Sequence, residues 1–506
     1  MILIHPPVAK PCEPPGGIAR LSGALTAHGI RHKLLDANLE ALLYTLQNTE
    51  PVIHGQHDKW TSRTFRNLAD NLAAIKDQYI YQNIDRYKRA VIDLNHVVEM
   101  ALNNNSIVGL SDYRHKELSP LRSADLIRAA ENPEHNPYYP YFRKRLPAII
   151  QQEASTMIGF SLNYLSQAIC TFAMIGFLKQ QYPMATIILG GGLVTSWMSN
   201  PHWKNPFAGL VDALVTGPGE HQLLSLMDVA GIKNTHCIPD FNALPLNDYL
   251  SPGLVLPYNA STGCYWNKCA FCPEKAESSP YIPMPVNRVM EDIGRLVVRI
   301  KPVLVHLLDN AVSPALLKRI AEKPFGVPWY GFARIDRRLT DIDFCTALKQ
   351  SGCVMLKLGL ESGDQGVLDK MHKGIDLNTA SLALKTLKQA GIATYIYLIF
   401  GTPAETLPEA RKTLEFIAAH HETVSYLNLA IFNMPVCGAE IAEFETSSFY
   451  ESDLSLYTDF VHPKGWNRKQ VRQFLNNEFK KHKAVAEIIK KDPPIFTSNH
   501  APFFES

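Results

Sequence analysis

The stretch STGCYWNKCAFC, residues 261–272, places three cysteines, Cys264, Cys269 and Cys272, within nine positions. It closes a predicted strand at residues 257–262 and opens a loop. Thiolates are the side chains that iron–sulfur clusters and zinc prefer as ligands. Three of them in one loop can face one metal centre. Because no fourth cysteine lies nearby, a four-iron cluster held there would keep one iron open to chelate a substrate or cofactor.

The same three cysteines are also compatible with a structural zinc site, which needs four ligands. His306 or another histidine would then complete the site, so the spacing alone leaves both kinds of metal centre open. Nine cysteines in a chain of this length do not make a disulfide framework. The six outside the loop are scattered and are interpreted as small buried residues: Cys12, Cys170, Cys237, Cys345, Cys353 and Cys437.

Strand and helix patterns alternate after the cysteine loop. Short apolar runs predict strands, and apolar residues at helical spacing between them predict helices. Six such units are typical of a partial (β/α)6 barrel, which we expect over residues 257–440 with its chemistry at the carboxyl ends of the strands. The predicted strands are 257–262, 303–308, 329–333, 354–360, 393–400 and 424–431, and the predicted helices are 286–299, 313–322, 340–350, 377–389 and 405–419.

The N-terminal part of the chain has a different α/β pattern. A strand, a helix and a second strand open a doubly wound, Rossmann-like domain. We expect it to span residues 1–231, with a mostly helical insertion at about 40–150, followed by a linker at 232–256. The remaining residues, 441–506, are predicted to be a helical tail whose Pro- and Phe-rich end packs over a core, with the barrel mouth as one candidate. The predicted strands are 2–5, 32–36, 157–161, 186–189 and 212–215.

The composition argues against several classes of protein. Of the 506 residues, 46% are hydrophobic and 19% are charged, so the chain can bury sizeable cores. Its formal net charge of +2 creates no global field toward nucleic acid or an anionic membrane. No apolar run approaches the ~18 residues of a membrane span, and the start lacks the pattern of a secretory signal. We therefore expect a soluble, cytoplasmic protein with no nucleic-acid or membrane partner.

At the cysteine loop the chain resembles the radical S-adenosylmethionine (SAM) superfamily, and within it the members with an N-terminal cobalamin-binding domain. In that family three cysteines after the first barrel strand bind a 4Fe–4S cluster, usually as CxxxCxxC with an aromatic residue before the last cysteine. Phe271 occupies the aromatic place, where the resemblance implies a contact with SAM. The chain has one additional residue between Cys264 and Cys269, which affects the loop geometry rather than the number of ligands.

Further segments extend this resemblance over residues 255–435. Glu361 and Ser362 lie in a Gly-Leu-Glu-Ser-Gly stretch that looks like the family's fourth-strand segment, where polar residues contact the methionine or ribose part of SAM. By the same resemblance, Gly401 lies near the adenine, Arg334 is placed to reach the SAM carboxylate, and Asp309 lies near the methionine amino group. The order of these segments along the chain also fits the family.

The N-terminal domain resembles cobalamin-binding domains, although their DxHxxG motif is missing from the sequence. The resemblance implies a cobalamin with no protein histidine below the cobalt, and His5 at the end of the first strand is the alternative ligand. A doubly wound domain that has lost its ligand is the other interpretation. The residues that the resemblance places at the cobalamin are Ser161, Gly190, Gly191, Gly192, Gly217, Gly219 and Glu220.

The resemblance implies an enzyme that reductively cleaves SAM at its 4Fe–4S cluster. A cobalamin-dependent methyltransferase acting on an unactivated carbon is the expected activity. The alternatives are a radical SAM cyclase or rearrangement enzyme, with or without cobalamin, and, from another class, a zinc-stabilised binding protein. The expected partners are a small-molecule or peptide substrate and an external electron donor such as flavodoxin or ferredoxin. No motif assigns further catalytic side chains or the substrate.

Overall fold

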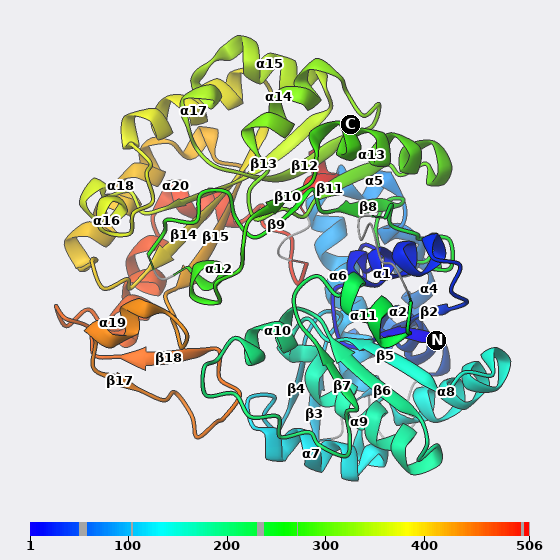
Figure 1. The fold of residues 1–506 in the computed structure, drawn as a ribbon. Helices are drawn as coiled ribbons and strands as arrows, with labels where there is room; N and C mark the ends of the chain where they lie inside the picture. Colours follow the sequence, from blue (N-terminus) through cyan, green and yellow to red (C-terminus); the bar gives the residue numbers. More distant parts are fainter. Residues whose placement is uncertain (50–57, 103–104, 230–236, 271, 497–499, 505–506) are drawn as a thin grey trace. The chain divides into compact units, whose positions relative to one another are not determined.

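The computed structural model of the protein describes residues 1–49, 58–102, 105–229, 237–270, 272–496 and 500–504, which form two compact units (Figure 1). Unit 1 consists of Met1–Leu254 with two later stretches, Tyr450–Ser455 and Pro494–Phe496. Unit 2 consists of Val255–Phe449, Leu456–Pro493 and the end of the chain. The division after Leu254 falls near the end of the predicted linker, of which residues 232–236 lie outside the described residues.

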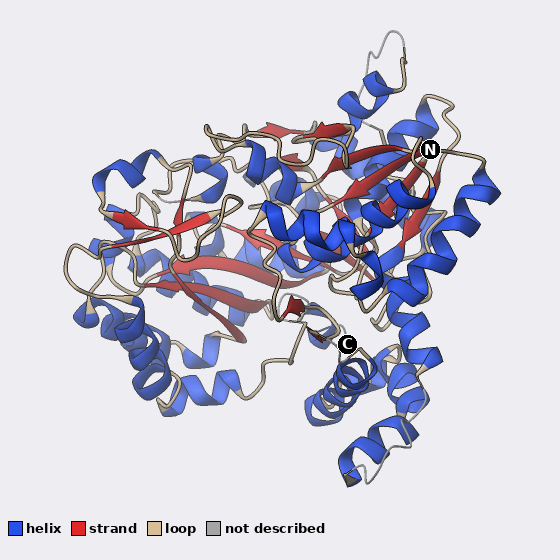
Figure 2. Ribbon diagram, turned by 90° about the horizontal axis from the view of Figure 1, so that it is seen from below, coloured by secondary structure: helices blue, strands red, loops and turns tan. Residues whose placement is uncertain are grey.

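Unit 1 contains a parallel sheet of five strands in its described residues, in the order β2-β1-β5-β6-β7. Helices lie on both faces of this sheet (Figure 2), which confirms the doubly wound fold. The strand order reverses between β1 and β5, and ligands of such folds bind beyond the carboxyl ends of the strands at that point. The strands are β1 (Ile2–His5), β2 (Lys33–Asp36), β5 (Met157–Ser161), β6 (Thr186–Gly190) and β7 (Ala213–Val215).

The helices of the sheet follow from local sequence signals. The first, α1, ends just before Gly29, whose φ of +70° is a left-handed conformation that glycine adopts without strain. The glycine therefore stops the helix, as the sequence predicts. The other helices that connect these strands are α9 (Leu165–Gln181), α10 (Gly192–Met198) and α11 (Glu220–Leu226), and α1 itself spans Gly16–Ala27.

The segment between β2 and β5 is mostly helical in its described residues. It also contains an antiparallel hairpin of two three-residue strands, which are too short for an alternating pattern to reveal. The hairpin consists of β3 (Ser106–Val108) and β4 (Tyr113–His115). The helices are α2 (Ala37–Asn48), α3 (Lys59–Arg66), α4 (Leu68–Ile75), α5 (Gln78–Tyr81), α6 (Ile84–Ala101), α7 (Ser123–Glu131), η1 (Pro133–His135) and α8 (Tyr139–Glu153).

Unit 2 contains a sheet of six parallel strands in its described residues, in the order β15-β14-β13-β12-β11-β8. This is the predicted partial barrel, because each strand pairs with the next one along the chain and the first and last strands stay unpaired with each other. The strands are β8 (Val255–Tyr258), β11 (Leu304–Leu307), β12 (Trp329–Ala333), β13 (Cys353–Glu361), β14 (Ala393–Phe400) and β15 (Tyr426–Ile431).

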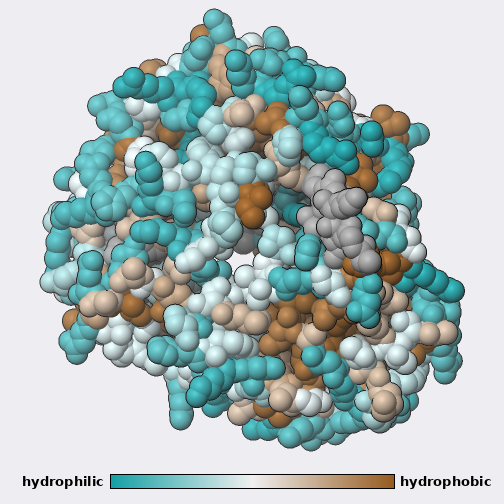
Figure 3. All heavy atoms as spheres, in the orientation of Figure 1, coloured by the Kyte–Doolittle hydropathy of each residue, from teal (hydrophilic) through white to brown (hydrophobic). Residues whose placement is uncertain are grey.

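Helices cover the outside of this barrel (Figure 1), and hydrophilic side chains cover most of the visible surface over α14, α15 and α17 (Figure 3). Each helix therefore buries one apolar face against the sheet. The helices are α13 (Val286–Ile300), α14 (Pro314–Glu322), η2 (Arg337–Thr340), α15 (Ile342–Gln350), α16 (Gln365–Lys370), α17 (Leu377–Gln389), α18 (Leu407–Ala419) and η3 (His421–Thr423). Among the described residues, no helix combines the length and apolar composition that crossing a bilayer requires.

The predicted tail is not purely helical. Two short strands of the tail, β17 and β18, form an antiparallel sheet with β16, which precedes the tail, in the order β16-β18-β17. The helical part of the tail includes a π-helical turn, η5. The strands are β16 (Met434–Pro435), β17 (Thr446–Ser447) and β18 (Tyr457–Phe460). The helical elements are η4 (Ala439–Glu443), α19 (Arg468–Phe474), η5 (Leu475–Phe479), α20 (Lys483–Ile489) and η6 (Ala501–Phe504).

The end of the chain packs over a core, but at the opposite end of the barrel from the predicted mouth. Ala501 and Phe504 join a cluster with Tyr395 and Tyr426, which lie near the amino ends of their strands. The His500 ring stacks on Tyr395 with ring centroids 4.7 Å apart. The segment therefore packs over a core, and the barrel mouth, one candidate for its position, is not where it lies. Its apolar composition predicts burial, but it does not say which end of the barrel receives it.

Candidate cluster and cofactor site

The cysteine loop begins where β9 (Ser261–Thr262) pairs with β10 (Ile282–Pro283). Gly263 follows with a φ of +69°, and a Cβ atom there would lie 2.5 Å from the carbonyl oxygen of Pro280. Only glycine fits at this point, so the chain can turn sharply into the loop immediately before Cys264. α12 (Pro273–Ala276) begins directly after Cys272.

All three cysteines are free and partly buried. Burial raises the pKa of the Cys272 thiol, backbone hydrogen bonds from Lys275 and Glu274 lower it, and the neighbouring Cys269 and Cys264 raise it further. The three thiols are therefore close enough to interact electrostatically. They provide the donor set that a four-iron cluster takes from its protein, one thiolate for each of three irons.

The alternative of a zinc site lacks support at His306. Its Nε2 atom lies 2.9 Å from the ammonium of Lys357, and its ring stacks on Tyr330 with centroids 4.3 Å apart. Both contacts hold the imidazole inside the barrel. Within the part of the chain that the structure describes, no group of three or more His, Cys, Asp or Glu side chains, the three cysteines included, is placed to hold a single metal ion, so this observation does not separate zinc from a cluster.

Trp266, inside the cysteine loop, holds the loop to the segment that follows α16. Its indole Nε1 donates to the His372 carbonyl at 3.1 Å. Its ring lies so close to Gly374 that a Cβ atom there would be 2.2 Å from it. The backbone N–H of Ala270 also donates to the Met371 carbonyl at 2.9 Å. The loop is thus fixed against the turn that follows α16.

Arg334, at the end of β12, joins the same contact. Its guanidinium lies 4.0 Å from the centroid of the Trp266 ring, and its Nη2 donates to the Lys373 carbonyl at 2.5 Å. A cation over an indole face is favourable. Arg334 therefore positions the cysteine loop in this structure. Its predicted contact with the SAM carboxylate stays a prediction.

Glu361 ends β13 in an unusual backbone conformation. Its φ of +69° is uncommon for a residue other than glycine, and the strand pairing shifts between Gly359 and Glu361. Its carboxylate forms a 2.6 Å ion pair with Lys373, and both side chains are mostly buried. A Cβ atom at Gly359 would lie 2.5 Å from the Glu361 Oε1 atom, so the small residue makes room for the carboxylate.

Ser362 and Asp309 are both committed to internal hydrogen bonds. The Ser362 hydroxyl is fully buried, lies 3.2 Å from the Thr413 hydroxyl and accepts from the backbone N–H of Asp364. Asp309 accepts from the Ala260 N–H at 3.0 Å and from the Ser261 hydroxyl. Burial raises the pKa of Asp309, while these hydrogen bonds lower it. Their predicted contacts with SAM are untested, but both residues shape the mouth of the barrel.

Gly401 lies at the end of β14 with a φ of +83°, and a Cβ atom there would be 3.0 Å from Val471 of α19. Its N–H donates to the Oε2 atom of Glu405 at 2.5 Å, and the Trp466 indole donates to the same oxygen at 3.1 Å. Glu405 is fully buried, its Oε1 atom has no hydrogen-bond partner in the described residues, and burial raises its pKa to about 7. The sequence analysis missed Glu405. Its position four residues after Gly401, at the end of a predicted strand, is the signal that could have identified it as a partner of this loop.

The inner face of the barrel carries further polar residues that the sequence analysis missed. Lys357 is almost fully buried, and its ammonium lies 4.9 Å from the Tyr330 ring centroid and 5.1 Å from that of Phe332. The Phe332 ring also contacts Tyr397. Lys357 lies in the middle of an otherwise apolar strand, which is the signal that could have singled it out. The predicted SAM contact Phe271 lies outside the described residues.

The residues predicted to bind cobalamin come together at the carboxyl edge of the sheet in unit 1. Asn163 connects two of the loops there, because its side-chain amide donates to the Ser161 hydroxyl at 3.1 Å and its Oδ1 atom accepts from the Gly192 N–H at 3.0 Å. Gly191 has a φ of +111°, and a Cβ atom there would lie 2.4 Å from the Leu162 carbonyl oxygen. The glycine at 191 is therefore required by the close approach of two backbone segments, whether or not a ligand binds.

The next loop at this edge is more open. Gly217 has a φ of +59°, its N–H donates to the Thr195 hydroxyl at 2.9 Å, and a Cβ atom would meet nothing within 4 Å. A Cβ atom at Gly219 would lie 3.2 Å from the Val215 side chain. Glu220 is buried and pairs with Arg20 at 2.5 Å, so its carboxylate is already neutralised.

His5, the alternative cobalt ligand, is buried at the end of β1 beside Asp36 of β2. Burial lowers the pKa of His5, and the nearby Asp36 opposes this effect. Its Nε2 atom lies 3.5 Å from the Gln167 amide, and its Nδ1 atom has no hydrogen-bond partner in the described residues. The ring is therefore neutral and has one unused nitrogen at the point where the strand order reverses.

Residues 258–417 match a family model described as the radical SAM superfamily. The match runs from the end of β8 into α18, and includes the cysteine loop and the strand ends at Arg334, Glu361 and Gly401. It confirms the resemblance that the sequence analysis drew from the cysteine loop.

Two curated relatives match smaller shares of the chain. An uncharacterized methyltransferase of Pyrococcus horikoshii is 27% identical over 191 residues, which cover 35% of this chain and 40% of the relative. The anaerobic magnesium-protoporphyrin IX monomethyl ester cyclase of Rubrivivax gelatinosus is 22% identical over 281 residues, which cover 46% of this chain and 49% of the relative. The chain therefore spans less than half the length of either relative.

Solved structures of TsrM, a radical SAM methyltransferase from Kitasatospora setae, resemble nearly the whole chain. The structure with tryptophan substrate and the SAM analogue aza-SAM has a TM-score of 0.53 and 13% identity, and covers 97% of this chain and 89% of TsrM. The structure with cobalamin and a 4Fe–4S cluster has a TM-score of 0.52 and 14% identity, and covers 97% of this chain and 91% of TsrM. At this identity the likeness shows the fold alone.

Proposed function

We propose that this protein, whose residues 258–417 form a radical SAM domain, cleaves SAM reductively and transfers a methyl group from cobalamin to an unactivated carbon. The observation that carries the proposal is the set of three free, partly buried thiols in a loop fixed against the turn at residues 371–374. When bound, the cluster supplies the electron and open iron for SAM cleavage, and cobalamin supplies the methyl group.

In this proposal each cysteine of the loop ligates one iron. The residues around the loop fix its backbone and so limit where the three thiolates can lie. Trp266 and Arg334 hold the loop to the turn at residues 371–374. Asp309 fixes the start of the loop through its hydrogen bonds to Ala260 and Ser261. Glu361 presents a carboxylate beside this loop, paired with Lys373, where it can accept hydrogen bonds from SAM.

In unit 1 the proposed cobalamin lies beyond the carboxyl edge of the sheet. Ser161, Gly192 and Gly217 line that edge, and the open space beside Gly217 is suitable for a bulky ligand. The buried and neutral His5 provides no charge there; because its Nε2 atom accepts from the Gln167 amide, its proton lies on Nδ1. Methyl transfer is also supported by the relative from Pyrococcus horikoshii, which is named a methyltransferase.

A radical SAM cyclase is the second candidate, because one matched relative is named a cyclase. Either activity requires a small-molecule or peptide substrate and an external electron donor such as flavodoxin or ferredoxin, which we propose as partners. Free thiols are stable in a reducing compartment, so we also propose that the protein works in the cytoplasm.

Anaerobic reconstitution with iron, sulfide, cobalamin and reductant tests the proposal. After SAM is added, we expect 5′-deoxyadenosine and S-adenosylhomocysteine to be released together, with about four irons bound per chain. 5′-Deoxyadenosine without bound cobalamin or S-adenosylhomocysteine would favour the cyclase. One zinc per chain with no sulfide would rule out both and leave a zinc-stabilised binding protein.

A further inference from the structure

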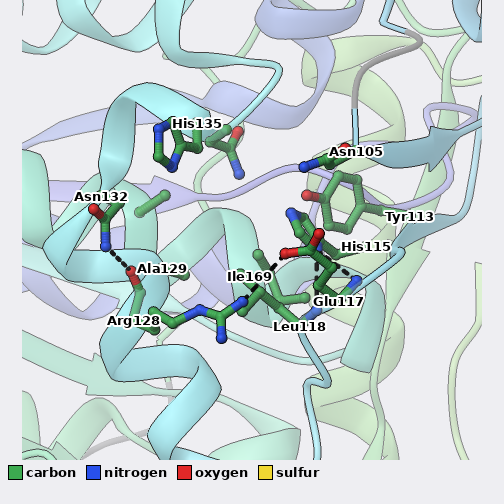
Figure 4. Close-up of a pocket in the computed structure, with 12 residues that line it drawn as sticks. Asn105, Tyr113, His115, Glu117, Leu118, Arg128, Ala129, Asn132, His135 and Ile169 are labelled. Carbon is green, nitrogen blue, oxygen red and sulfur yellow. Dashed lines mark hydrogen bonds and ion pairs between the residues drawn. The ribbon is translucent and has the colours of Figure 1, made fainter.

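A small polar pocket lies in unit 1, away from the predicted cofactor residues (Figure 4). It is formed by the β3–β4 hairpin, α7, η1 and one face of α9. Its volume is about 70 Å³, and one water needs about 10–15 Å³ by this measure, so roughly five heavy atoms fit. The polar residues that line it include Asn105, Tyr113, His115, Arg128, His135 and Asn136.

Tyr113 is the first sign of a ligand. Its side chain is 5% exposed, and the polar group beside its hydroxyl is the Ser106 hydroxyl. The two hydroxyls do not form a well-aligned hydrogen bond with each other or with another described residue. Burial raises the pKa of Tyr113, so its hydroxyl keeps its proton and remains a donor. Buried polar groups are nearly always satisfied, and Figure 4 shows this hydroxyl turned toward the space that Asn105 also faces.

The tautomer of His115 makes it a second donor. Its Nδ1 atom accepts hydrogen bonds from the backbone N–H groups of Glu117 at 3.1 Å and Leu118 at 3.0 Å. Burial lowers the pKa of His115, so the ring is neutral at pH 7. A neutral imidazole that accepts at Nδ1 carries its proton at Nε2. His115 therefore offers one N–H group in addition to its backbone contacts.

The remaining polar groups also favour donation. Asn136 uses its Oδ1 atom to accept from the Tyr138 N–H, while its amide nitrogen donates to the Cys170 sulfur at 3.5 Å and keeps a second N–H. The Arg128 guanidinium forms an ion pair with Glu117 at 3.4 Å. The Arg128 side chain is 52% exposed and the Glu117 side chain is 62% exposed. Such an ion pair is weak, so Arg128 can exchange it for a ligand.

We infer that this pocket binds an oxyanion of about the size of phosphate, free or carried by a larger molecule, through Tyr113, His115 and Arg128. Hydrogen bonds from these donors to an anionic oxygen are stronger than those to a neutral acceptor, and guanidinium groups match the geometry of phosphate and carboxylate. Glu117 also lines the pocket. Because its side chain is 62% exposed, it can turn to solvent when the oxyanion enters.

Calorimetric titration of the full chain with inorganic phosphate tests the inference. We expect saturable binding that Tyr113→Phe and Arg128→Gln each weaken by about tenfold. Tyr113→Phe should fold normally, because its hydroxyl loses at most a poorly aligned contact with the Ser106 hydroxyl. Arg114→Gln is the matched control, since Arg114 lies on the same hairpin, is 77% exposed, pairs with Asp112 and does not line the pocket. Binding that is unchanged in both pocket variants would overturn the inference.

Two further titrations, one with a Glu117 variant and one with a nucleoside monophosphate, define the ligand. Glu117→Gln removes a competing carboxylate and should strengthen phosphate binding. Weaker phosphate binding in this variant would mean that Arg128 does not exchange Glu117 for the oxyanion and would contradict the inference. A nucleoside monophosphate that binds at least tenfold more tightly than phosphate would identify a carried phosphate, and equal affinity would identify a free one. Failure of both probes to bind would refute the site, whatever the outcome for SAM cleavage, because neither titration requires a bound cluster.

Discussion

In both unit 1 and unit 2, glycines and polar residues lie at the carboxyl edge of a parallel sheet. The two units differ in the contacts that fix the loops at this edge. In unit 2 the loop with Cys264 is held by side chains, chiefly the Trp266 indole and the Arg334 guanidinium. In unit 1 the loops are held by close backbone approach, as of Gly191 to the Leu162 carbonyl, and by the Asn163 side chain.

The difference teaches how far each kind of motif indicates chemistry. A glycine such as Gly191 is demanded by the folded backbone, so it says little about a ligand. The backbone conformation of the loop does not require its three thiols. Trp266 and Arg334 fix the position of the loop and do not bind the sulfur atoms. The cysteine motif therefore predicts a cofactor more directly than the glycine run does, and the following experiments test that contrast.

The largest effect should come from Cys264→Ala. Loss of one iron ligand should lower SAM cleavage by more than about 100-fold, because loss of even an outer partner of a metal site costs about 10–100-fold. The measurement is iron content and 5′-deoxyadenosine release after reconstitution. Cys437→Ser, a change at another partly buried free cysteine, should retain both. Full activity of Cys264→Ala would remove the basis of the proposed function.

Gly191→Ala should destabilise unit 1 by about 3 kcal/mol or more, because the new Cβ atom meets a backbone oxygen at 2.4 Å and the φ of +111° disfavours alanine. Gly192→Ala should change stability by less than about 0.5 kcal/mol, since its Cβ atom would meet only the Asn163 side chain and backbone, both at 3.8 Å or more. Urea unfolding measures both. If Gly192→Ala keeps its stability but loses cobalamin, the glycine run also serves the ligand.

Glu405 should make the stability of unit 2 depend on pH. Burial raises the pKa of Glu405 from 4.5 to about 7, so between these values the folded chain keeps a proton that the unfolded chain has released. The contribution of this group to the free energy of unfolding is therefore fully present below pH 4.5 and is lost as the pH rises to 7. The loss amounts to about 3 kcal/mol.

The matched variant is Glu405→Gln, which keeps the shape of the side chain and removes its titration. Thermal unfolding of both proteins between pH 5 and pH 8 gives the comparison. We expect the wild-type protein to lose stability relative to the variant as the pH rises. Parallel pH profiles would show that Glu405 is ionised throughout this range.

The smallest effect should come from Trp266→Phe. The change removes the hydrogen bond to the His372 carbonyl and weakens the stack with Arg334, which together cost about 1 kcal/mol. The fold should persist, but a chelator should extract iron faster from the variant because the loop opens more often. An unchanged extraction rate would mean that the loop is held without its aromatic contact.

The sequence alone determined the elements whose signals are local. The strands at 329–333 and 393–400 match β12 and β14 residue for residue, and the helix stop at Gly29 follows from one glycine. The cysteine spacing predicted a metal centre but left its kind open, and together with the later segments it predicted the match of residues 258–417 to the radical SAM family model. Such features depend on a few consecutive residues, so composition and periodicity reveal them.

Only the tertiary structure decided the contacts between distant segments. The partnership of Glu405 with Trp466 joins residues 61 positions apart, and the contact between Lys357 and His306 joins residues 51 positions apart. The burial of Ala501 at the amino ends of the barrel strands and the pocket around Tyr113 are of the same kind. Local patterns predict that such residues are buried or helical. Which groups they meet depends on how the whole chain packs, because each contact forms only when both segments reach their places in the fold.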